Sequence, residues 1–177
     1  MAISAANLKW YLTQGGGSSD GGAAGTPAGS LGGYRSSTAI TDASDNNLFD
    51  DVSGDEASAG RTEYRAIAFR NEDATSGGLQ SAKLWIETQT PGGDSVEIGL
   101  DLAGANAAGA TIATETDAPS PAVTFSSACT SKATGLSLGT LTQNQYYIIW
   151  VKRIVPASCA AYNANSFVLK VEGDSAA

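Results

Sequence analysis

The chain has 177 residues, which is enough for one domain with a sizeable hydrophobic core, and 42% of its residues are hydrophobic. Only 16% are charged, the formal net charge at pH 7 is -8 and the lysines and arginines are scattered, which argues against a nucleic acid partner because phosphate binding needs clustered cations. The absence of histidine excludes the commonest general base, Ser/His and Cys/His nucleophile pairs and most zinc and non-haem iron sites.

The first residues contain neither a basic leader nor a long apolar run, and no later segment approaches the roughly 18 apolar residues of a membrane span. We therefore expect a protein that is made in the cytoplasm and has no membrane partner.

The N-terminal region begins with an alternating segment. Leu8, Trp10 and Leu12 lie on one face of a predicted first strand. Residues 14–33 follow, and nine of these twenty are glycine. Such a run cannot bury enough apolar surface to offset its chain entropy alone, so we interpret it as a flexible arm or as a loop laid against its neighbours. We group residues 1–61 as the N-terminal strand, this Gly-rich arm and an acidic connector.

The acidic connector holds four carboxylates within seven positions: Asp50, Asp51, Asp55 and Glu56. Calcium takes carboxylate and carbonyl oxygens, so these residues are a candidate calcium site. The surrounding sequence does not match the twelve-residue calcium loop, because glycine is missing at the turn position. The alternative is a solvated loop in which Asp and Ser cap a helix or a turn. We favour this alternative and predict no metal site.

From Thr62 onward, short strand-like segments alternate with turn-rich ones that carry Gly, Pro, Asn and Asp. The predicted strands are 63–70, 79–88, 95–102, 122–126, 145–155 and 166–172. No segment keeps a helical period, since the Ala-rich stretch is interrupted by Gly and Thr. The sequence therefore predicts an all-β fold in which residues 62–177 form an antiparallel β-sandwich with Ig-like or jelly-roll-like connections.

The segment 145–155 is apolar on both faces. One face carries Tyr146, Ile148, Trp150 and Ile154. The other face carries Tyr147, Ile149, Val151 and Val155. An antiparallel strand with one wet face should alternate apolar and polar residues. Either a second layer of this chain covers the strand, or the set Tyr147, Ile149, Val151 and Val155 faces another subunit. The polar turn before the strand, residues 136–147, also resembles a tyrosine corner.

Cys129 and Cys159 are the only cysteines, too few for a metal cluster. A disulfide between them would close a loop of about 30 residues and add roughly 3 to 4 kcal/mol in the chain-entropy model. They can equally bond to other subunits or stay reduced. Cytoplasmic synthesis favours free thiols at first, and release into an oxidising medium would permit the bond.

Enzyme signatures are missing from the sequence: there is no GxSxG, P-loop or dinucleotide fingerprint. We predict no catalytic residue, no cofactor and no enzymatic activity. A glycoside hydrolase would need two carboxylates in a sugar-binding cleft. Trp10, Trp85 and Trp150 are conceivable sugar platforms, but Trp85 and Trp150 lie inside predicted strands, where a core position is simpler.

Several phrases of the sequence resemble a family of small structural proteins of tailed bacteriophages. They are LKWYLT with the later SLGG, NLFDDVSGDEASAGRTEYRAIAFRN, LQSAKLWIET and VKRIVPASCAAYNANSFVLKVEGD. The resemblance implies a virion component without enzymatic activity that is present in many copies, and it transfers no functional residue.

We therefore expect a homo-oligomeric capsid decoration or cement protein, made in the host bacterial cytoplasm, that contacts the major capsid protein. The alternatives are a neck, collar or tail component and a carbohydrate- or receptor-binding β-sandwich module.

Overall fold

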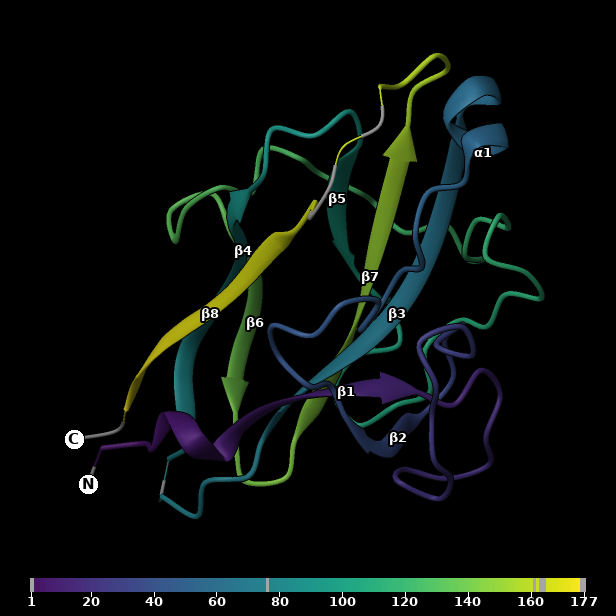
Figure 1. The fold of residues 1–177 in the computed structure, drawn as a ribbon. Coiled ribbons are helices and arrows are strands. Elements are labelled where there is room, and N and C mark those ends of the chain that lie inside the picture. Colours follow the sequence, from purple (N-terminus) through teal and green to yellow (C-terminus); the bar gives the residue numbers. More distant parts are fainter. Residues whose placement is uncertain (1, 76, 161, 163–164, 176–177) are drawn as a thin grey trace.

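The computed structural model describes residues 2–75, 77–160, 162 and 165–175. Two antiparallel sheets pack face to face (Figure 1), which confirms the predicted all-β sandwich. The strands are β1 (Leu8–Thr13), β2 (Arg35–Ala39), β3 (Arg61–Asn71), β4 (Leu79–Gln89), β5 (Ser95–Leu100), β6 (Leu136–Leu141), β7 (Tyr146–Val155) and β8 (Phe167–Ser175), and the helices are η1 (Ala5–Asn7) and α1 (Gly54–Ala59). No helix of the described residues is both long enough and apolar enough to cross a membrane.

The larger sheet has the strand order β2-β1-β3-β7-β5, and the smaller sheet has the order β6-β4-β8. From β3 onward the chain changes sheet at every strand, because β4, β6 and β8 lie in the smaller sheet while β5 and β7 return to the larger one. The centre of the larger sheet is the pairing of β3 with β7, which runs without interruption from Arg61 opposite Val155 to Arg70 opposite Tyr146.

Strand β7 is covered on both faces by its own chain. Ile149 and Val151 are 0% exposed in the core between the sheets, Val155 is 3% exposed, and Tyr147 packs against that core. Of these four residues, for which we weighed a subunit interface, Ile149, Val151 and Val155 are therefore buried within their own chain, and Tyr147 is partly buried. The intrachain alternative accounts for their burial.

The opposite face of β7 forms a second hydrophobic cluster. Tyr146, Ile148 and Trp150 are at most 1% exposed, and Ile112 and Val123 cover them from the long connection between β5 and β6. This cover explains why β7 is apolar on both sides. The Tyr146 hydroxyl donates to the Ala107 carbonyl 39 positions upstream, at 3.4 Å, so the contact differs from the local one of a tyrosine corner.

The Gly-rich segment 14–33 is an ordered loop laid against the larger sheet. Beyond the end of β1, Ser30 replaces β1 as the neighbour of β3. The Ala66 amide of β3 donates to the Ser30 carbonyl at 2.8 Å. The Ser30 hydroxyl in turn donates to the Ala66 carbonyl at 2.6 Å and accepts from the Thr13 amide at 2.9 Å. Buried hydrogen bonds thus replace the apolar contacts that this segment lacks. Strands β1 and β2 belong to the same sheet, so the N-terminal strand that we grouped with residues 1–61 is part of the sandwich.

Three elements differ from the sequence prediction. Residues 122–126 do not form a strand: Ser126 makes an isolated bridge to Ile98, and Pro119 and Pro121 before it cannot donate to a ladder. Strands β2 and β6 were not predicted, because RSSTA has no apolar alternation and we assigned LSLGTL to a turn.

We expect Gly32→Ala to destabilise the fold by about 2 to 4 kcal/mol. Gly32 has φ +96°, and a Cβ there would lie 1.8 Å from the Ala110 carbonyl oxygen and 3.0 Å from the Trp150 ring. The matched control is Gly54→Ala, where a Cβ meets nothing within 4 Å and φ is not positive. Urea unfolding followed by tryptophan fluorescence should give a lower midpoint for Gly32→Ala only, and equal midpoints would contradict the packing described here.

Candidate functional site

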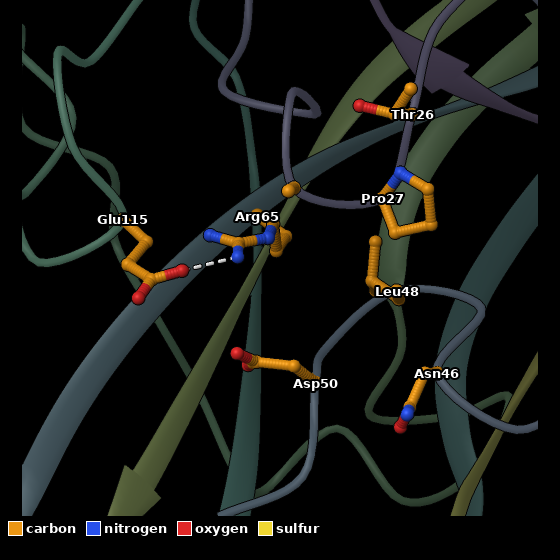
Figure 2. Close-up of a pocket in the computed structure, with 8 residues that line it drawn as sticks. Thr26, Pro27, Asn46, Leu48, Asp50, Arg65 and Glu115 are labelled. Atoms are coloured by element: carbon orange, nitrogen blue, oxygen red, sulfur yellow. Dashed lines mark hydrogen bonds and ion pairs between the residues drawn. The ribbon is translucent and has the colours of Figure 1, made fainter.

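A cavity of about 270 Å³ opens where the Gly-rich segment, the loop before α1, strand β3 and the connection after β5 meet. It is lined by Thr26, Pro27, Ala28, Asn46, Leu48, Asp50, Arg65 and Glu115. Figure 2 shows Arg65 and Glu115 pointing toward one another at the cavity, with Asp50 beside them. These groups come from distant parts of the sequence, and the fold brings them together at this cavity.

An ion-pair network adjoins this cavity, and three of its members, Asp50, Arg65 and Glu115, line it. Glu63 of β3 stands opposite Arg153 of β7 in the strand register, and the Arg153 Nε donates to Glu63 at 2.6 Å. Arg153 also donates to the Asp50 backbone carbonyl at 2.6 Å and lies 3.3 Å from its carboxylate. Arg65 donates to Glu115. Glu63 is 1% exposed and Arg65 is 2% exposed, so these two charges are buried, whereas the Asp50 side chain at the rim of the network is exposed.

Arg61 joins both halves of the network at its outer end. Its guanidinium lies 2.9 Å from Glu63, 3.0 Å from Glu56 and 2.5 Å from Glu115. The Arg61 Nε and the Glu63 Oε1 are close enough for an ion pair, but they are not aligned for a hydrogen bond. Three arginines therefore face four carboxylates, and the charges of the site nearly cancel.

The strand period explains how these charges meet. Arg61, Glu63 and Arg65 are two residues apart along β3, so their side chains share one face of the strand. The same face continues through Ile67 and Phe69 into the core between the sheets. The inward face of β3 is thus apolar along one half and ionic along the other.

The loop before α1 closes the ionic end of the core. Leu48 and Phe49 are buried there, and the Phe49 ring lies under the Arg153 guanidinium, 4.7 Å from centroid to Cζ. The alternation of charged residues ahead of Ile67 is a signal of this site that the sequence prediction missed.

The pKa values of the network favour fixed charges. Partial burial raises the pKa of Glu115, but Arg65 and Arg61 lower it more, and the pKa lies below its usual value. The hydrogen bond from the Ser53 amide lowers the pKa of Glu56. Burial lowers the pKa of Arg61, but Glu63, Glu56 and Glu115 raise it more. A general acid or base needs a pKa near the working pH, so these three groups are suited to structure and not to proton transfer.

A metal ion does not fit this network well. Oxygens of Asp50, Glu63 and Glu115 lie within 4.8 Å of one another, as metal ligands would. However, Arg153 and Arg65 already occupy these oxygens, and their charge would repel a cation. The arrangement is therefore an ion-pair network.

The four carboxylates of the predicted calcium candidate do not converge on one point among the described residues. Asp50 and Glu56 reach the ion-pair network, while Asp51 and Asp55 are exposed. Asp55 and Glu56 lie in the first turn of α1, where Ser53 and Glu56 form a capping box. The helix-capping alternative describes this segment.

The remaining sequence candidates lie away from the cavity. Cys129 is buried beside β4, Cys159 is partly exposed, and both thiols are free. Trp150 and Trp85 are 0% and 6% exposed, in keeping with the core positions expected for them, and Trp10 packs on Phe69 with ring centroids 4.9 Å apart. The structure thus places all three tryptophan rings in packing roles.

We expect Glu63→Gln to destabilise the protein by about 3 to 5 kcal/mol, because the buried Arg153 loses its buried anionic partner and keeps only the exposed Asp50 carboxylate. The control is Asp51→Asn, an exposed change that should alter the free energy of unfolding by less than about 0.5 kcal/mol. Urea denaturation curves compare the two variants. A Glu63→Gln midpoint equal to that of the control would show that the network contributes nothing to stability.

We also expect acid to weaken the network. The pKa of Glu115 is lower in the folded protein than in the unfolded chain, where it is about 4.3, so its stabilising effect is complete above that pH and disappears as pH falls through the folded value. The difference in unfolding free energy between the wild type and Glu115→Gln should be constant from about pH 7 to 5 and shrink below about pH 4. A difference that does not change with pH would contradict this assignment.

Comparison of the chain with known protein families, with curated proteins and with solved structures finds no match.

Proposed function

We propose that the protein is a non-enzymatic structural protein of a bacteriophage virion, a capsid decoration or cement protein that acts through contacts with major capsid subunits. The observation that carries the proposal is the ordered Gly-rich surface of residues 14–33, held on the larger sheet by buried hydrogen bonds. The resemblance to phage structural proteins in the sequence supports the same function.

A surface of this kind is suited to close contact between proteins. Its exposed positions are glycine, alanine and serine with Asp20 and Thr26, so little side-chain entropy is lost when a partner covers it. The glycines also bring backbone close to backbone: a Cβ at Gly25 would lie 2.7 Å from the Thr13 carbonyl oxygen. Because the surface is ordered before contact, binding has little further ordering cost.

The charge distribution indicates which partners suit the protein. Among the residues that the structure describes, nine of the ten lysines and arginines form ion pairs with carboxylates of the same chain, Lys83 being the exception. Several carboxylates, among them Asp42, Asp45 and Asp51, are exposed and take part in none of these pairs. The outer surface is thus acidic, which suits a neutral or basic protein partner and opposes nucleic acid.

The test is binding to empty heads assembled from the major capsid protein that the same genome encodes. Wild-type protein should co-sediment with the heads and saturate. Ala24→Arg, an exposed change in the Gly-rich surface, should weaken binding at least about tenfold because it places a long cation in a close contact.

The matched control is Ala133→Arg, which adds the same charge at an exposed position before β6. Wild-type protein that fails to bind heads at saturating concentration would contradict the decoration function, and binding to neck or tail assemblies instead would favour that alternative. Equal binding by both variants would exclude the Gly-rich surface as the contact.

A further inference from the structure

Strand β8 is an outer strand of the smaller sheet. It pairs with β4 along one edge, and in the part of the chain that the structure describes no strand pairs with its other edge. Figure 1 shows β8, in yellow, on the near side of the sandwich beside β4. Its nine residues, Phe167–Ser175, contain no proline, so the free edge offers a full set of backbone donors and acceptors. Such an edge is a template for pairing with another strand.

The two faces of β8 have different chemistry. The outward face carries Val168, Lys170, Glu172 and Asp174 in alternation. Phe167, Leu169 and Val171 point inward and pack against the core, but they are only partly buried. Val168 is 48% exposed and is one of three large apolar side chains on the surface of the described residues. An additional strand at this edge would cover apolar surface on both faces.

A second copy of β8 can pair antiparallel with this edge, and several features favour one register. Two identical antiparallel strands in one sheet are related by a two-fold axis perpendicular to the sheet. Directly opposed side chains of an antiparallel pair lie on the same face of the sheet. The axis must therefore lie level with a residue, which is then opposite its own copy, and not between two residues. With the axis at Val171, the midpoint of Phe167–Ser175, the whole strand overlaps its copy.

The charges agree with the same register. An axis at Val171 places Lys170 of each copy opposite Glu172 of the other. An axis at Lys170 or at Glu172 would instead place like charges opposite one another. Opposite charges across a strand pair are stabilising and like charges are destabilising.

The inward face also fits this register. A hollow of about 200 Å³ lies under the C-terminal half of β8, lined by residues that include Ile3, Leu8, Val171, Gly173 and Ser175. With the axis at Val171, the partner's Leu169 lies opposite Gly173 and the partner's Phe167 lies opposite Ser175. Large apolar side chains of one copy thus meet small residues and a hollow in the other.

We infer that the protein forms a two-fold symmetric homodimer in which the β8 strands of two copies pair antiparallel about Val171, joining the two smaller sheets into one. Within one chain, Lys170 pairs with Glu87 and Glu172 pairs with Lys132, each at 2.8 Å. These ion pairs are exposed and therefore weak, so they do not prevent the contacts across the dimer. The dimer does not depend on the proposed virion function.

Charge reversal tests the register directly. Lys170→Glu and Glu172→Lys each place like charges opposite one another in the dimer, so each variant alone should be monomeric where the wild type is dimeric. A mixture of the two variants restores both pairs and should give a one-to-one heterodimer. The double variant Lys170→Glu/Glu172→Lys should dimerise by itself. Sedimentation velocity gives the masses, and circular dichroism checks that each variant is folded.

The control is Lys9→Glu, a charge reversal on β1 at a similarly exposed lysine, which should leave the dimer intact. A wild type that stays monomeric up to about 100 μM would overturn the inference, since a specific dimer should form at micromolar concentration. Dimers of both single variants, or no heterodimer in the mixture, would also overturn it. Failure to bind heads together with a normal dimer would count against the proposed function alone.

Discussion

The antiparallel pairing of β3 with β7 is the constraint on which the rest of the structure depends. It joins segments about ninety positions apart, as the pair Glu63 and Arg153 shows, and it sets which side chains face each sheet surface. One face of this pair meets the smaller sheet, and the other is covered by the long connection between β5 and β6. Every other layer of the molecule is positioned against these two strands.

The same pairing explains why a buried charge network lies beside a hydrophobic core. Along β3 the inward positions change from Phe69 and Ile67 to Arg65 and Glu63, while Arg153 makes the matching change on β7. An ionic end of a core is stable only when each charge has a partner, and three segments supply them: β7, the loop before α1 and the connection that carries Glu115. The network closes the sandwich where apolar side chains run out, and its electrostatics suit that structural role.

Much of the fold could be predicted from the sequence, because β1, β3, β4, β5, β7 and β8 have apolar alternation or long apolar runs. Strand β2 could not, since its RSSTA sequence is ordered by backbone bonds to the Gly-rich loop and to β1. The ion-pair site was also missed, although its charged alternation is visible in the sequence. Arg61, Glu63 and Arg65 alternate as a solvent-facing strand would, and only the distant Glu115 and the covering loop make them buried. Of the acidic connector, the sequence indicated the helix cap but not the contact of Asp50 with Arg153.

The alternation of the chain between the two sheets has a consequence for the order in which the protein can fold. Strand β4 lies between β6 and β8, and β3 lies between β1 and β7, so each sheet is completed only when a strand from the second half of the described residues has joined it. Nearly all stabilising pairings connect distant positions, which slows folding because long loops must close first. The sandwich can therefore close only after β7 and β8 are both available for pairing.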